Sequence, residues 1–117
     1  MSAVLHNNAG DIIYSEDFIA SIAGVAATEC YGVVGMTAKK VRDSVADILG
    51  KENVKKGVKV STDQTNAVKI ELHIVVEFGT SIAALGNSII QTVRYNVEKM
   101  TGLTVKDINV VVSGIRV

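Results

Sequence analysis

Hydrophobic and polar residues alternate most regularly between Ala67 and Phe78. A period of two predicts a β-strand with one buried face and one face that meets water. Because the apolar face needs a cover, we expect the rest of the chain to pair with this strand or to pack on it. The apolar positions are Val68, Ile70, Leu72, Ile74, Val76 and Phe78, and the residues between them are Lys69, Glu71, His73, Val75 and Glu77.

Apolar residues at three- and four-residue spacing predict three helices. The first follows Ser15, a predicted N-cap, and ends at Gly32. The second is short and covers residues 37–49. The third begins after Thr80 or Ser81 and runs to about residue 101, with Gly102 as its C′ residue. Its apolar stripe is formed by Ile82, Leu85, Ile89, Ile90, Val93, Val97 and Met100.

Three further segments are predicted strands. Residues 11–14 form a short one, residues 58–62 form a hairpin with the alternating segment through a turn at 63–66, and residues 107–117 form the last. Gly114 is predicted to mark a bulge, because the apolar residues after it fall out of phase. The polar segments 1–9 and 51–57 are expected to be a loose tail and a mobile basic loop.

Residues 32–36 leave three interpretations open: a short buried strand, a helix–helix connection, or a GxxG nucleic-acid loop. The complete order is strand, helix, short helix, strand, strand, helix, strand. It predicts an α+β fold, a two-layer sandwich whose small, mainly antiparallel sheet carries the helices on one face. The 117 residues fit a flexible tail, 1–9, and a single domain, 10–117. With only 4% aromatic residues, the core must be aliphatic.

Charge is unevenly distributed although the formal net charge is zero. Residues 1–38 contain four acidic residues and no Lys or Arg, whereas residues 39–59 contain seven basic residues and three acidic ones. Such asymmetry can steer a partner or a second copy of the chain, although solvated helix faces are the simpler interpretation. The candidate partner-binding residues are Lys39, Lys40, Arg42, Lys55 and Lys56.

No motif in the sequence indicates catalysis. His73 has carboxylates on its strand face but no second histidine nearby, so a solvent-facing side chain is expected rather than a base or metal ligand. Cys30 lacks a Cys-x-x-Cys partner and is predicted to be a buried, unreactive thiol. Residues 79–81 lack the P-loop pattern and indicate a strand end followed by an N-cap. We therefore expect no enzyme, no cofactor and no metal.

A small KH-like nucleic-acid-binding module is the alternative function. Two predicted helices around the Gly32–Gly35 loop, followed by the basic segment 39–59, are typical of that module. The two central valines and the neutral charge make nucleic acid a poorer partner than protein. Direct membrane insertion is not expected, because no apolar run approaches the roughly 18 residues of a spanning helix.

Seven stretches, taken in order, resemble the alkaline shock protein family, also called the envelope stress response family, and within it the small YloU-like members. The resemblance extends from about Gly10 to the end of the chain, and it departs from the family at Phe78, where Tyr is usual. The matching stretches are residues 10–15, 22–26, 32–36, 57–60, 75–79, 97–103 and 108–115.

The resemblance implies a non-enzymatic, cytoplasmic protein of Gram-positive bacteria that is linked to cell-envelope (alkaline) stress. It implies a homo-oligomer and, as in some members, attachment at the membrane through an integral membrane protein partner. It brings neither catalytic residues nor a cofactor. The expected function is therefore that of a structural or adaptor protein that acts through self-association and protein partners.

Overall fold

The computed structural model describes residues 2–37, 48–49 and 51–117. It confirms the mixed α+β class. The predicted order of elements is wrong, because it lacks the strands β1, β3 and β4, which the structure places before the central hairpin. The elements are β1 (Ser2–Asn7), β2 (Gly10–Ser15), α1 (Glu16–Thr28), β3 (Val33–Thr37), β4 (Ile48–Leu49), the 3₁₀ helix η1 (Lys51–Gly57), β5 (Val58–Thr62), β6 (Val68–Glu77), α2 (Ile82–Thr101) and β7 (Val105–Arg116).

Strand β6 is the centre of the main sheet, as its alternating pattern predicts. β7 runs parallel to β6 along the whole of one edge. On the other edge, β5 pairs with residues 68–72 and β3 with residues 74–76, both antiparallel, so these two strands follow one another along it. β4 extends the sheet beyond β3.

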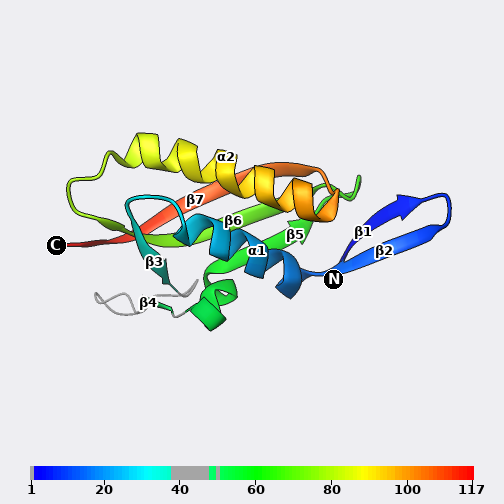
Figure 1. Cartoon of the computed structure of the whole chain (residues 1–117), viewed down its shortest axis with the longest axis horizontal. Coiled ribbons are helices and arrows are strands. Elements are labelled where there is room, and N and C mark those ends of the chain that lie inside the picture. Colours follow the sequence, from blue (N-terminus) through cyan, green and yellow to red (C-terminus); the bar gives the residue numbers. More distant parts are fainter. Residues whose placement is uncertain (1, 38–47, 50) are drawn as a thin grey trace.

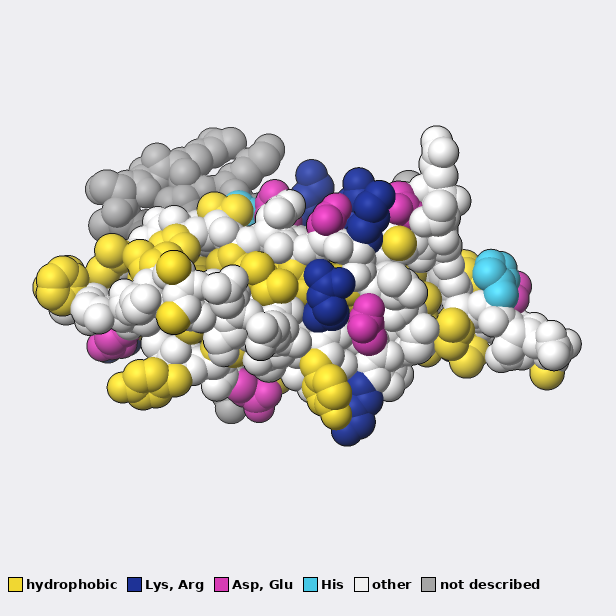
Figure 2. Space-filling model, turned by 90° about the horizontal axis from the view of Figure 1, so that it is seen from above, with side chains coloured by type: hydrophobic (Ala, Val, Ile, Leu, Met, Phe, Trp, Pro, Cys, Tyr) yellow, Lys and Arg dark blue, Asp and Glu magenta, His cyan; other side chains and the backbone are white. Residues whose placement is uncertain are grey.

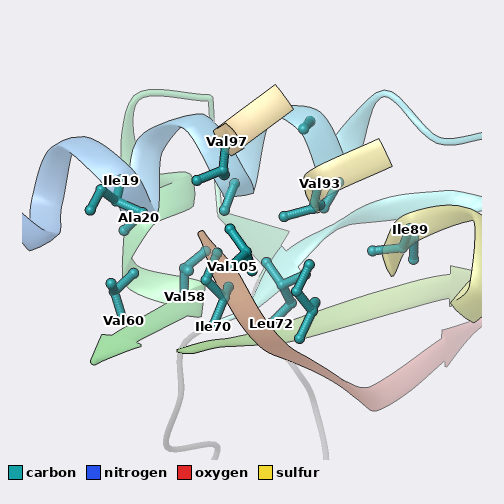
Figure 3. Close-up of a cluster of buried hydrophobic side chains, with 14 of the residues drawn as sticks. Ile19, Ala20, Val58, Val60, Ile70, Leu72, Ile89, Val93, Val97 and Val105 are labelled. Atoms are coloured by element: carbon teal, nitrogen blue, oxygen red, sulfur yellow. The ribbon is translucent and has the colours of Figure 1, made fainter. Parts of the chain in front are cut away.

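Helices α1 and α2 lie side by side on one face of this sheet (Figure 1). Buried aliphatic side chains from both helices and from the strands meet between the two layers (Figure 3). The core is therefore aliphatic, as the composition predicts. The labelled core residues are Ile19, Ala20, Val58, Val60, Ile70, Leu72, Ile89, Val93, Val97 and Val105.

Three local signals in the sequence are confirmed. The hydroxyl of Ser15 accepts a 3.1 Å hydrogen bond from the N–H of Phe18 and caps α1. Gly102 ends α2 in the left-handed conformation, with φ of 76°, which glycine adopts without strain. The β6–β7 register skips Ser113 before Gly114, which is the predicted bulge.

The structure bears on three predictions about the middle of the chain. Of the interpretations of residues 32–36, the strand is right, and the Gly32–Gly35 segment is therefore not a loop between helices. α1 ends at Thr28 rather than at Gly32. The helix predicted over 37–49 falls on residues 38–47, which lie outside the described part of the chain, and its flanking residues belong to β3 and β4.

The segment predicted to be a mobile loop is η1. Its one valine, Val54, is buried against α1 at Gly24, where an added Cβ would lie 2.9 Å from Val54 Cγ2. A single apolar residue in a polar stretch gives no periodicity, so this contact was not predictable from the pattern.

Residues 2–7 are not a loose tail, because they pair antiparallel with β2. The hairpin projects from one end of the body (Figure 1). Long-range contacts hold its base: Tyr14 Oη donates a 2.8 Å hydrogen bond to the carbonyl of Thr101, and the side-chain amide of Asn66 binds both backbone groups of Val4. Much of the hairpin faces water, including Ile12 and Ile13, which are 44% and 66% exposed.

Asp63 organises the turn between β5 and β6. Its carboxylate accepts hydrogen bonds from the hydroxyl and N–H of Thr65 and from the N–H of Ala67, and it lies 3.4 Å from Lys106 Nζ. The hydroxyl of Thr65 and the N–H of Ala67 are the main causes that lower the pKa of Asp63 to about 2.

We predict that Asp63→Asn lowers stability at neutral pH and reduces its acid dependence. Because the folded pKa lies below the unfolded one, the carboxylate stabilises the fold above about pH 4, and this contribution is lost as pH falls towards 2. Urea unfolding at several pH values between about 5 and 2 measures the effect. Identical pH dependence in the variant and the wild type would show that Asp63 contributes nothing.

Candidate interaction site

The aromatic side chains of this chain lie mainly on the surface. There are three Tyr and two Phe. Tyr31 is 98% exposed and Phe78 70%, whereas Phe18 and Tyr95 are 45% and 61% exposed. Tyrosine and phenylalanine are enriched at protein–protein interfaces, because a rigid ring buries much surface at little entropic cost. Their placement outside the core therefore points to an interaction surface.

Tyr31 and Phe78 lie together at one end of the sandwich. The N–H of Glu77 donates a 2.9 Å hydrogen bond to the carbonyl of Gly32, and the N–H of Phe78 donates one of 2.9 Å to the carbonyl of Arg116. The second bond places Phe78 beside the C-terminal Val117, which is fully exposed, and the first brings the segment of Tyr31 to the same end of β6. We call the residues Tyr31, Phe78 and Val117 the aromatic end. Figure 2 shows hydrophobic side chains gathered at the end that carries the C-terminus in Figure 1.

A cleft of about 660 Å³ opens between the two aromatics and the start of α2. Its walls come from the α1–β3 connection, the β6–α2 connection and the first turns of the helix. Clefts of this size accommodate small ligands or the side chains of a partner. The lining includes Tyr31, Gly32, Phe78, Thr80, Ala84 and Ser88.

Two glycines fix the backbone of the aromatic end. Gly32 has φ of 101° and Gly79 has φ of 88°, conformations that favour glycine. A Cβ added at Gly32 would lie 2.9 Å from Thr80 Cγ2, so the two connections pack closely. Tyr31 and Phe78 are therefore presented on an ordered frame, which reduces the entropy that a partner must remove on binding.

Neither of the two basic candidates that the structure describes lies at the aromatic end. Lys39, Lys40 and Arg42 lie outside the described residues. Lys55 and Lys56 lie in η1, away from the aromatic end (Figure 1). Lys55 Nζ is 3.5 Å from Asp17 Oδ2 in α1, so one acidic residue of the first helix meets the basic segment within the same chain.

The other candidate side chains have local partners. His73 differs from the prediction, since its side chain is only 12% exposed and its Nε2 lies 2.9 Å from Glu71 Oε2. Cys30 is buried, as predicted, with its thiol 3.6 Å from the carbonyl of Ala26. Within the described ranges, no three His, Cys, Asp or Glu side chains are arranged to hold a metal. No helix there is long and apolar enough to cross a membrane.

The sequence pattern missed the aromatic end. Phe78 continues the alternation of β6 and was predicted to be buried, but the strand ends at Glu77 and the ring points into water. The helical stripe was overextended in the same way, since Ile82 and Met100 are 42% and 61% exposed. The usable signal is an aromatic residue directly before a glycine in the connection between two elements, in Tyr31-Gly32 and Phe78-Gly79.

Comparisons with known proteins place the chain in a family. The model of the ASP23 (alkaline shock protein) family, described as having a cell envelope-related function, matches residues 4–117. The Bacillus subtilis protein YloU is 38% identical over 118 residues, covering 100% of this chain and 98% of that one. The Bacillus subtilis protein YqhY is 34% identical over 107 residues, covering 92% and 78%.

A more distant relative is a stress response regulator gls24 homolog of Streptococcus pyogenes serotype M3. It is 28% identical over 107 residues, which cover 92% of this chain and 59% of that one. No solved structure matches. On the family model and the full-length similarity to YloU, the chain belongs to the ASP23 family.

Proposed function

We propose that this chain is a structural or adaptor protein of the cell-envelope stress response, and that it works through self-association and protein partners rather than by catalysis. The family's envelope-related function and the stress-response name of a distant relative support the setting. The observation that carries the interaction role is the aromatic end, where Tyr31 and Phe78 stand exposed beside a cleft.

Exposed aromatic rings lower solubility, but on an ordered backbone they bind a partner at a small cost in conformational entropy. Interface energy concentrates in a few aromatic anchors that fill pockets and lose water on contact. An apolar side chain of a partner would fit the cleft while Tyr31 and Phe78 cover its flanks. The proposed location is the cytoplasm, at the membrane through an integral membrane protein partner that this end recognises.

Affinity capture tests the proposal. A tagged copy is purified from cells in a mild detergent, with and without nuclease treatment, and co-purifying proteins are identified by mass spectrometry. We expect a membrane protein partner whose recovery does not depend on the nuclease. Recovery of RNA-binding or ribosomal proteins, lost on nuclease treatment, would contradict the proposal and favour nucleic-acid binding.

The basic segment is a second, weaker contributor. We predict that Lys39→Glu, Lys40→Glu, Lys55→Glu and Lys56→Glu together reduce partner capture several-fold at low salt, and less at high salt, because exposed charges act mainly on association. The control carries Lys69→Glu and Lys99→Glu, two exposed lysines outside residues 39–59. Unchanged capture would remove the basic segment from the proposal.

A further inference from the structure

The outer edge of β7 has no strand partner among the described residues. β7 contacts the sheet through β6 alone (Figure 1). A long apolar edge strand is a template for pairing with another chain, since its outward N–H and C=O groups are unsatisfied by backbone. Charged side chains stand near the ends of this strand, at Lys106, Asp107 and Arg116, whereas the middle is Ile-Asn-Val-Val-Val.

The register shows which backbone groups of β7 point outward. In a parallel pair of strands, when the backbone N–H and C=O of one residue bond to the partner strand, the N–H and C=O of the residue opposite it point away from the pair. The N–H of Val68 donates a hydrogen bond to the carbonyl of Thr104, the residue before β7, so the backbone groups of Val68 point towards β7. The backbone groups of its register partner Val105 therefore point outward. Side chains satisfy Val105: Arg94 Nη1 donates to its carbonyl at 2.6 Å, and Glu98 Oε2 accepts from its N–H at 2.9 Å.

The same alternation makes four later residues of β7 face outward. They lie opposite the residues of β6 that bond towards β7, because the register skips Lys106 after Val105 and Ser113 after Val112. Phe78, which donates to the carbonyl of Arg116, agrees with this assignment at the far end. The outward-facing residues are Ile108, Val110, Val112 and Ile115.

This edge is complementary to itself. When a second β7 lies antiparallel with Val111 opposite Val111, Val110 meets Val112 of the second copy. Beyond the Ser113 bulge, Ile108 then meets Ile115 of the second copy. All four are outward-facing residues, so each of these pairs can exchange two backbone hydrogen bonds. The pairs between them, with Val111 at the centre, are the non-hydrogen-bonded positions that an antiparallel ladder requires.

Side chains agree with the same register. Ile108 and Ile115 share the helix-covered face with their β6 partners, so they would pack together across the junction. Asp107 and Arg116 share the opposite face, because their β6 partners are Lys69 and Glu77. Asp107 therefore lies opposite Arg116 of the second copy. Because of the two-fold symmetry, the dimer contains two of these ion pairs.

The helix layer is incomplete along the same edge. A cavity of about 330 Å³ lies between α2 and β7, where a Cβ added at Gly86 would meet no atom within 4 Å. Figure 2 looks onto this side of the molecule and shows a band of hydrophobic side chains running from the C-terminal end. A continuing strand would cover that band. The cavity is lined by Ile82, Gly86, Ile90, Ile108, Val110 and Val112, among others.

We propose that β7 pairs antiparallel with β7 of a second copy, to give a two-fold symmetric dimer with one continuous sheet and Val111 on the symmetry axis. The proposal rests on the proposed function and names the surface of its self-association. The antiparallel arrangement sends the two aromatic ends to opposite ends of the dimer. One dimer then offers two partner sites, and a partner that is itself multivalent is held more tightly than by one site.

Disulfide trapping tests the register. Opposed residues at a non-hydrogen-bonded position have Cα atoms about 4.5 Å apart, a separation that a disulfide can span. Val111→Cys is expected to form a covalent dimer on mild oxidation. Asn109→Cys is the matched control, because it lies on the same face but opposite Gly114 of the second copy. Absence of the Val111→Cys dimer, or equal cross-linking by both variants, would overturn the register.

Charge exchange tests the same pairing without new thiols. Asp107→Arg alone or Arg116→Asp alone is expected to raise the dimer dissociation constant about tenfold by placing like charges opposite each other, and the double exchange is expected to restore it. Light scattering against concentration gives the constant. A monomer mass at high micromolar concentration, or no rescue by the double exchange, would contradict the dimer. Partner capture is measured separately, so failure of this dimer is distinguishable from failure of the adaptor function.

Discussion

Leu72→Ala is expected to lower the free energy of unfolding by about 2–5 kcal/mol. Leu72 is fully buried at the centre of β6, with Val58 of β5 on one side and Val110 of β7 on the other. The helices close the core above it, so the truncated side chain leaves a cavity that its neighbours cannot fill. Because a domain of this kind is stable by only about 5–15 kcal/mol, the loss is a large fraction of the total.

Urea unfolding followed by circular dichroism measures this loss. The control is Lys69→Ala on the exposed face of the same strand, which is expected to change stability by no more than about 0.5 kcal/mol. A Leu72→Ala variant as stable as the control would mean that β6 is not the centre of the core.

Replacing both rings of the aromatic end, Tyr31→Ser with Phe78→Ser, is expected to reduce partner capture by at least about tenfold and to leave stability nearly unchanged. Interface anchors of this type each contribute about 2 kcal/mol or more, and a tenfold change in affinity corresponds to about 1.4 kcal/mol. Both rings are exposed, so their loss removes little from the core.

The matched control for this pair is Tyr95→Ser on α2. Tyr95 is also exposed, and its ring contacts Lys99, whose Nζ lies 5.5 Å from the ring centre. Capture by the control is expected to match the wild type. Equal loss in the control would mean that general surface hydrophobicity, and not the aromatic end, holds the partner.

The central part of the fold was predictable because its signals are local. The alternation along β6 specifies a half-buried strand without reference to the rest of the chain, and Ser15 and Gly102 mark helix ends through their own backbone preferences. The phase change at Gly114 likewise predicted the bulge, since a slip of one residue moves side chains to the other face.

Elements that depend on distant contacts were not predictable. β1 is fixed at its base by Asn66, more than sixty positions away, and no pattern within residues 1–9 contains that information. β3 is only five residues long and pairs with β6 through a bulge, so its sequence did not distinguish a strand from a loop.

The site was harder to predict than the fold. Phe78 continues the apolar alternation, and only the left-handed turn at Gly79 takes the chain away from the core after Glu77. Tyr31 is brought close to Phe78 by the hydrogen bond between Gly32 and Glu77, which joins two segments far apart in the sequence. The sequence pointed instead to the lysines, whose uneven distribution is visible without a structure.

The most direct test of the adaptor role is the distribution of the tagged protein between membrane and soluble fractions of gently broken cells. The wild type is expected in the membrane fraction together with one integral membrane protein, and the Tyr31→Ser, Phe78→Ser variant in the soluble fraction. Recovery of the wild type in the soluble fraction without a protein partner, or an unchanged membrane fraction for the variant, would contradict the role assigned to the aromatic end.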